Sequence, residues 1–225
     1  MGSWNWFSKS GFNSSSTAEQ VTEGIDATRL TAIVTGATSG IGKETARMLA
    51  LRGANVIMLS RDLKNGLKTK ELILQENPEA KLEVMEMDLA SIKSITSFAQ
   101  SFNASQQPLN ILINNAGILA CPFQLSKDGI ELQFATNHLG HFLLTKLLMD
   151  KLTTTARKTG IEGRIINVSS IAHRKYSKED SLLDLEIINN PTKYWHFLLC
   201  NYFYNLISMH FMNTHVAGLI SSSLN

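Results

Sequence analysis

Short apolar segments alternate with segments of helical spacing through most of this 225-residue chain, and no other feature constrains its fold as strongly. The segments rich in β-type apolar residues are 30–35, 55–60, 82–87, 109–114 and 164–168. The segments with helical spacing are 43–51, 63–75, 91–102 and 132–152. Because strands joined by single helices form βαβ units, the sequence predicts an α/β fold with a doubly wound parallel sheet.

Composition divides the chain into three predicted parts. Residues 1–28 contain six serines, and the first 18 of them include no Asp or Glu. Residues 29–193 have the composition of an ordinary globular domain. Residues 194–225 contain no Lys, Arg, Asp or Glu but hold seven aromatic residues. We therefore predict a serine-rich N-terminal segment, one α/β domain and a charge-free aromatic tail.

Composition also excludes several classes of protein. A hydrophobic content of 44% is too high for a disordered chain, and a net charge of +2 gives no reason to expect a nucleic-acid partner. Cys121 and Cys200 are the only cysteines, which excludes a disulfide framework and favours buried thiols. No run of about 18 apolar residues occurs, so we do not predict a membrane-spanning helix.

A glycine-rich turn lies between the first predicted strand and the first predicted helix. Its sequence is Thr35-Gly36-Ala37-Thr38-Ser39-Gly40-Ile41-Gly42. Glycines at such a turn let the backbone approach a pyrophosphate, and the helix that follows offers unpaired N–H groups. The turn therefore predicts a dinucleotide site in a Rossmann-type sheet, with an ordinary tight turn as the alternative.

The residues after the second predicted strand indicate which dinucleotide binds. An acidic residue about 20 positions beyond the turn binds a ribose 2′-hydroxyl, whereas an arginine accommodates a 2′-phosphate. Arg61 lies at this position and Asp62 follows it directly. We predict that NADP(H) is preferred over NAD(H), while a solvated surface charge at Arg61 and the neighbouring Asp62 keep the alternative open.

Five motifs together resemble the short-chain dehydrogenase/reductase family. They are the glycine turn, Met87-Asp88-Leu89, Asn114-Asn115-Ala116-Gly117, Asn137-His138-Leu139-Gly140 and Asn167-Val168-Ser169-Ser170. The sequence of residues 135–142 is similar to that of the retinol-dehydrogenase-like branch. Residues 1–28 and 120–123 are similar to plant members associated with the translocon of the chloroplast inner envelope.

The resemblance implies roles for individual residues. Asn137 would belong to the catalytic proton-relay group, and Ser170 would hydrogen-bond the substrate carbonyl. The cofactor would be bound at the pyrophosphate, adenine and ribose by Gly36, Ser39, Gly40, Ile41, Gly42, Asp88, Leu89, Asn115, Ala116 and Gly117. The substrate would be a small apolar alcohol or carbonyl compound.

The catalytic Tyr-x-x-x-Lys element of this family is missing. A lysine four residues beyond the tyrosine lowers the tyrosine pKa from about 10 toward neutrality. In this branch the element is expected near residues 195–200, but the residues four positions after the four tyrosines are Asp180, Leu198, Leu206 and Ser208. Because relatives also continue for about a hundred further residues, we expect a C-terminally incomplete sheet with residues 164–168 at an open edge.

Two other features, a pair of histidines and the serine-rich start, bear on metal binding and on location. His138 and His141 lie three residues apart, a spacing that could suit a metal site. We instead favour packed or capping imidazoles and do not predict a metal site. The serine-rich start resembles a transit peptide but contains no Arg before Arg29. A chloroplast location is therefore implied by the resemblance alone, with a cytoplasmic or membrane-peripheral location as the alternative.

Three functional hypotheses follow. The first is an NADP(H)-dependent oxidoreductase that has little or no turnover, because the Tyr-x-x-x-Lys element is missing. The second is an NADP(H)-binding regulatory protein without chemistry, in a membrane complex. The third is an unstable truncated isoform.

Overall fold

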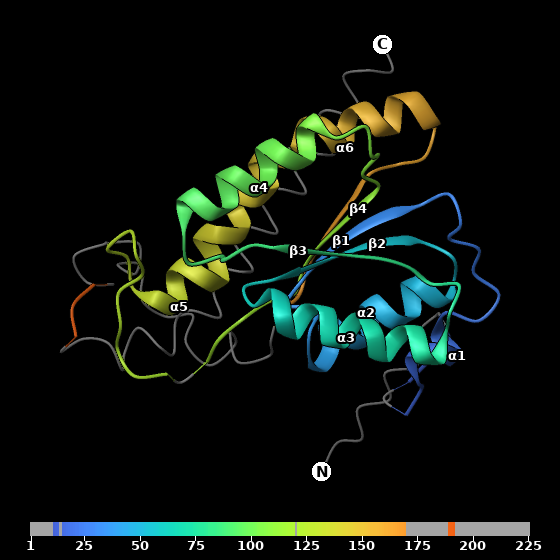
Figure 1. Cartoon of the computed structure of the whole chain (residues 1–225), viewed down its shortest axis with the longest axis horizontal. Coiled ribbons are helices and arrows are strands. Elements are labelled where there is room, and N and C mark those ends of the chain that lie inside the picture. Colours follow the sequence, from blue (N-terminus) through green and yellow to red (C-terminus); the bar gives the residue numbers. More distant parts are fainter. Residues whose placement is uncertain (1–10, 14, 120, 170–188, 192–225) are drawn as a thin grey trace.

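The computed structural model describes residues 11–13, 15–119, 121–169 and 189–191. Its elements in chain order are α1 (Ala18–Val21), β1 (Thr31–Thr35), α2 (Gly40–Leu51), β2 (Asn55–Ser60), α3 (Leu63–Glu76), β3 (Lys81–Glu86), α4 (Ile92–Ala104), β4 (Ile111–Asn114), α5 (Leu132–Phe134), the π-helical segment η1 (Ala135–Leu139), α6 (Gly140–Thr159) and β5 (Arg164–Asn167). The strands form one parallel sheet in the order β3-β2-β1-β4-β5. The predicted α/β fold with a doubly wound parallel sheet is confirmed (Figure 1).

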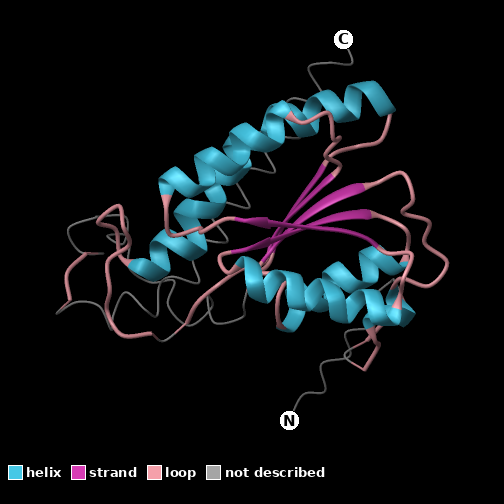
Figure 2. Cartoon of the chain, viewed as in Figure 1, coloured by secondary structure: helices cyan, strands magenta, loops and turns pink. Residues whose placement is uncertain are grey.

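Helices cover both faces of this sheet. Figure 2 shows α2 and α3 on one face and α4 and α6 on the other. Every residue of β1 is buried, as expected for a central strand of a parallel sheet that is covered on both sides. At the other extreme, β5 pairs with β4 alone within the described residues, and Arg164 and Ile166 are exposed on it.

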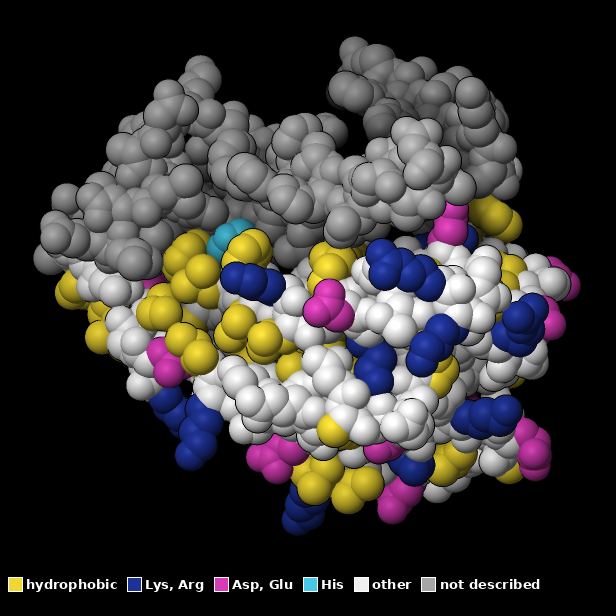
Figure 3. Space-filling view, turned by 90° about the horizontal axis from the view of Figure 1, so that it is seen from above, with side chains coloured by type: hydrophobic (Ala, Val, Ile, Leu, Met, Phe, Trp, Pro, Cys, Tyr) yellow, Lys and Arg dark blue, Asp and Glu magenta, His cyan; other side chains and the backbone are white. Residues whose placement is uncertain are grey.

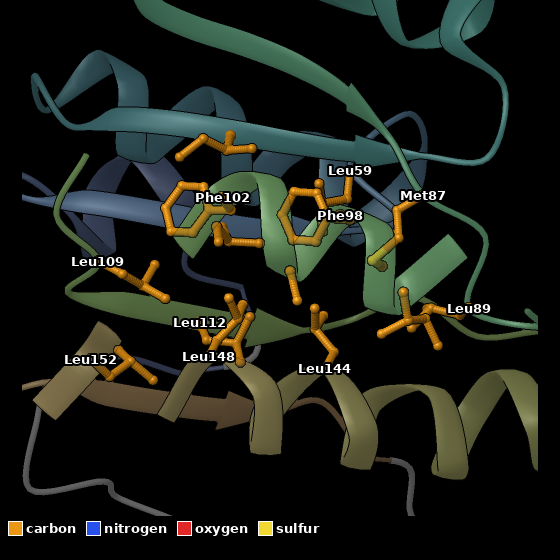
Figure 4. Packing of buried hydrophobic residues seen from close by; sticks show 14 residues of the cluster. Leu59, Met87, Leu89, Phe98, Phe102, Leu109, Leu112, Leu144, Leu148 and Leu152 are labelled. Carbon is orange, nitrogen blue, oxygen red and sulfur yellow. The ribbon is translucent and has the colours of Figure 1, made fainter. Parts of the chain in front are cut away.

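Two apolar clusters hold the layers together, one on each face of the sheet. On the α2 side, small residues such as Ala46 and Ala50 pack against Val34 and Met58. On the opposite face, α4 and α6 contribute larger side chains, including Phe102, Leu144 and Leu148 (Figure 4). The second cluster fixes the position of α6 against the sheet, and α6 continues directly from the segment that holds Asn137.

One predicted helix differs from the observed structure. The helix expected over residues 132–152 is divided into α5, η1 and α6, and it continues to Thr159. Gly160 ends it in the left-handed conformation, with a φ of 69° that glycine adopts without steric cost. The π-helical segment widens the helix where Asn137 lies.

The predicted divisions of the chain fall partly outside the described residues. The serine-rich segment is described from Gly11 onward except for Ser14, and its helix α1 is joined to α2 through Arg52. The guanidinium of Arg52 donates to Thr22 Oγ1 at 3.1 Å and to the carbonyl of Glu19 at 2.9 Å. The predicted tail, residues 194–225, lies outside the described residues.

Candidate functional site

The carboxyl ends of β1 and β4 form the point where the strand order of the sheet reverses. From β1 the chain winds outward to β2 and β3, whereas β4 and β5 lie on the other side. Ligands of doubly wound sheets bind in the crevice at such a point. The glycine turn follows β1 here and Asn115, Ala116 and Gly117 follow β4, so the structure brings these two predicted groups together.

Close packing explains the glycines of the turn. Gly36 has a φ of 65°, and a Cβ on it would lie 2.9 Å from Ala116 Cα. A Cβ on Gly42 would collide with the Gly36 carbonyl oxygen and with the Asn115 side-chain amide. The turn is therefore pressed against the segment after β4, with no space for larger residues at these two positions.

The amino end of α2 is open to a ligand. Asp62 and Ser91 cap α3 and α4 with their side chains, but Ser39 makes no side-chain hydrogen bond at the start of α2. Gly40 has nothing within 4 Å of a Cβ position, and Ile41 is 69% exposed. Backbone N–H groups at such a helix start can bind a phosphate.

Thr35 joins the glycine turn to the segment after β4. Its Oγ1 lies 2.9 Å from the backbone nitrogens of Asn115 and Ala116, which both donate to it. The Asn115 side-chain amide donates in return to the Thr35 carbonyl at 2.9 Å. The Thr35 Oγ1 also lies 2.9 Å from His141 Nε2. Sequence reasoning assigned no role to Thr35 or to this contact with His141.

Asn137 holds the loop after β4 in place. Its Oδ1 accepts from the Ile118 backbone N–H and its Nδ2 donates to the Ile118 carbonyl, both at 2.9 Å. Both polar atoms of the side chain are therefore bound to this loop. Its backbone carbonyl accepts a hydrogen bond from His141 Nδ1 at 3.0 Å.

Arg61 and Asp62, which follow β2, have different surroundings. Asp62 Oδ1 accepts from the Asn65 N–H at 3.1 Å as the N-cap of α3, and the Asp62 carbonyl accepts from Ser60 Oγ at 2.7 Å. One oxygen of the carboxylate, Oδ1, is thus used at the start of its own helix. Arg61 is exposed, and no salt bridge joins it to another described residue.

The loop after β3 places Asp88 and Leu89 differently. Asp88 is partly buried, and its Oδ1 accepts from the Ala90 N–H at 2.9 Å. Leu89 is 7% exposed and lines an apolar hollow of about 170 Å³ beside α4 and α6. Figure 3 views the molecule from the top of Figure 1. On the face seen there, hydrophobic side chains gather at one end, and Lys, Arg, Asp and Glu are interspersed over the rest of the coloured surface.

The second half of the predicted catalytic group falls outside the described residues. Ser170 and the region around residues 195–200 belong to that part of the chain, and the preceding Ser169 is exposed. The strand before them is fixed by Asn114, whose Nδ2 donates to Asn167 Oδ1 at 2.8 Å and to Thr145 Oγ1 at 3.0 Å.

The two histidines have different surroundings. The His138 ring is stacked with Phe134, at 5.3 Å between ring centroids, and with Phe142, at 6.5 Å. His141 is buried, and this burial lowers its pKa from 6.5 to about 4. Among the described residues, no three His, Cys, Asp or Glu side chains lie together as metal ligands would.

Comparisons with known proteins agree with this geometry. A family model described as short chain dehydrogenase matches residues 30–181. Short-chain dehydrogenase TIC 32 A, chloroplastic, of Brassica napus is 59% identical over 83% of this chain and 58% of its own length. Retinol dehydrogenase 12 of Mus musculus is 46% identical over 63% of this chain and 43% of its own length. The chain thus spans about half the length of the curated relatives it matches.

Solved structures show the same fold. A putative uncharacterized protein from Mycobacterium Paratuberculosis has a TM-score of 0.69 and 34% identity, covering 88% of this chain and 65% of that chain. A metagenomic short-chain oxidoreductase in complex with NADP has a TM-score of 0.55 and 24% identity, covering 75% of this chain and 71% of that chain. The resemblance to this family and to its retinol-dehydrogenase-like and plant members is confirmed.

Proposed function

This chain belongs to the short chain dehydrogenase family, and from that membership we propose that it binds NADP(H) at the glycine turn, in preference to NAD(H). The observation that carries the proposal is the packing of a glycine turn against residues 115–116, beside a helix start that no side chain caps. This arrangement fits a pyrophosphate, because it offers backbone N–H groups and leaves no Cβ in the way.

Each part of the cofactor has candidate partners around this turn. Gly36, Ser39, Gly40, Ile41 and Gly42 would hold the pyrophosphate. Asp88 and Leu89 would lie toward the adenine, and Asn115, Ala116 and Gly117 toward the ribose. A bound nicotinamide supplies hydride chemistry, whereas the protein supplies binding and orientation.

The preference for NADP(H) is supported by the contrast at the end of β2. A ribose 2′-hydroxyl needs an acceptor, and one oxygen of the Asp62 carboxylate is already used in capping α3. A 2′-phosphate needs a cation, and Arg61, directly before Asp62, is exposed.

We expect the Arg61→Glu variant to lose affinity for NADPH by about 10- to 100-fold, because a charge-assisted hydrogen bond contributes about 1.5–3 kcal/mol. Affinity for NADH is expected to change by less than about threefold, since NADH carries no 2′-phosphate. Thermal unfolding with and without each nucleotide measures both effects. Lys68→Glu, with the same charge change on α3, is the control. Equal losses for NADPH and NADH in Arg61→Glu would contradict the assignment.

The proposed reaction is an oxidation or reduction of an apolar alcohol or carbonyl compound, as in the family, with Asn137 and Ser170 as the catalytic residues present. We expect little turnover, because no tyrosine in the 225 residues has a lysine four positions later. Carbonyl-dependent oxidation of NADPH, compared with a Ser170→Ala variant, measures this. Rates well above that variant would contradict slow turnover.

The second candidate function is NADP(H) binding without chemistry, in a regulatory role. It is supported by the close packing of the glycine turn together with the missing Tyr-x-x-x-Lys element. NADPH affinity with no carbonyl-dependent oxidation above that of Ser170→Ala would favour this function, whereas slow oxidation that depends on Ser170 would favour the first.

A chloroplast location is proposed from the relative named TIC 32 A, chloroplastic. Association with a translocon complex of the inner envelope is part of the same proposal. No helix among the described residues has the length and apolar character needed to cross a membrane.

A further inference from the structure

The hydroxyl of Thr35 has a fully determined set of hydrogen bonds. A hydroxyl oxygen has one hydrogen to donate and two lone pairs to accept with. Both lone pairs are used by the N–H groups of Asn115 and Ala116, at 2.9 Å each. The single hydrogen must therefore be donated elsewhere, and His141 Nε2 at 2.9 Å is a closer acceptor than the Ile113 carbonyl at 3.4 Å.

The hydrogen bonds of His141 fix its protonation state. A carbonyl oxygen cannot donate, so the 3.0 Å contact between His141 Nδ1 and the Asn137 carbonyl requires a proton on Nδ1. Nε2 must then accept from Thr35, which requires Nε2 to carry no proton. Two independent contacts thus indicate the same species, a neutral imidazole with its hydrogen on Nδ1.

The imidazole joins two parts of the site that are far apart in sequence. On one side it contacts Asn137 in η1, whose side chain holds the loop at Ile118. On the other side it orients the hydroxyl that fixes the backbone of Asn115 and Ala116. Gly36 packs against that backbone, with a distance of 2.9 Å from its Cβ position to Ala116 Cα. A change at Nε2 would therefore reach the wall of the nucleotide turn.

We propose that His141 is a positioning residue: its neutral imidazole orients the Thr35 hydroxyl and so holds the segment after β4 in the shape that the nucleotide turn packs against. Its consequence for NADPH affinity rests on the proposed function, whereas its consequence for the Asn115 and Ala116 amides does not. His141 contacts Thr35, which is not among the residues proposed to hold the cofactor, so we expect it to act on the site through Thr35.

Three substitutions at His141 separate this role from simple filling of space. The amide of Gln lies where Nε2 lies and can accept from Thr35, whereas the shorter Asn reaches only the position of Nδ1. Phe has a similar shape but no acceptor. We expect the Kd for NADPH to rise about tenfold in His141→Phe and His141→Asn, and by less than about threefold in His141→Gln. A role in packing alone would favour Phe over Gln.

A second measurement does not need the nucleotide. Hydrogen exchange of the Asn115 and Ala116 amides should be about tenfold faster in His141→Phe and His141→Asn than in wild type, with His141→Gln close to wild type. The imidazole nitrogens of wild-type His141, followed by nitrogen-15 NMR, should show the tautomer with the proton on Nδ1. The tautomer readout remains available even if a variant folds poorly, because it is measured on the wild-type chain.

The outcomes are distinct. An imidazole with its proton on Nε2, or unchanged amide exchange in His141→Phe, would overturn the inference. Absence of NADPH binding by the wild-type chain would overturn the proposed function and the affinity consequence with it. Faster exchange in Phe and Asn but not in Gln would still support the coupling through Thr35.

Discussion

Gly42→Ala is expected to destabilise the protein by about 1–3 kcal/mol and to lower NADPH affinity by at least about tenfold. Alanine normally stabilises a helix relative to glycine, so the sign itself is informative. Here the added methyl would meet the Gly36 carbonyl oxygen and the Asn115 side-chain amide. The Asn115 amide is restrained because it is bound to the Thr35 carbonyl at 2.9 Å, and the Gly36 carbonyl belongs to the backbone of the turn. Urea unfolding and a nucleotide titration measure the two effects.

Gly163→Ala provides the matched control for this variant. Its nearest neighbours would be Leu152 atoms at 3.5 Å, which is ordinary van der Waals contact. We expect its free energy of unfolding to stay within about 0.5 kcal/mol of wild type. A Gly42→Ala variant as stable as Gly163→Ala would show that the turn is not held against the segment after β4 as described.

The secondary structure was predictable because local patterns determine most of it. β2 was predicted at 55–60 and lies at Asn55–Ser60, and Ser91 caps α4 as its sequence position indicates. η1 was not predictable in this way. Its position coincides with the binding of Asn137 to Ile118, a residue 19 positions earlier, and helical periodicity carries no signal for such a contact.

The candidate site was predictable only in part. The glycine turn follows a strand and opens a helix, so a local pattern located it. The role of Asp62 could also have been recognised, since Asp directly before a helical segment is a favoured N-cap. The Thr35–His141 contact joins residues 106 positions apart, and only the assembled sheet brings them together.

Acid is expected to destabilise the protein through His141. Burial is the main reason that its pKa is lowered to about 4 from 6.5, and the charge of His138 acts in the same direction. His138 is the titratable group that acts on it, from η1 directly before α6, while Thr35 of β1 and the backbone after β4 contribute groups that do not titrate. The hydrogen bond to the Asn137 carbonyl has the opposite, smaller effect.

The direction follows from which state binds the proton. Between about pH 6.5 and pH 4 the unfolded chain protonates this imidazole and the folded protein does not, so the free energy of unfolding falls as the pH falls. Above this window the stabilisation is complete. At about 1.4 kcal/mol for each unit of pKa difference, the loss across the window approaches about 3 kcal/mol. Urea unfolding of wild type and His141→Phe at about pH 7 and about pH 4.5 measures it, because Phe cannot titrate. Equal pH dependence in both proteins would show that His141 takes up its proton as readily folded as unfolded, and that the Thr35 hydroxyl does not require a neutral partner.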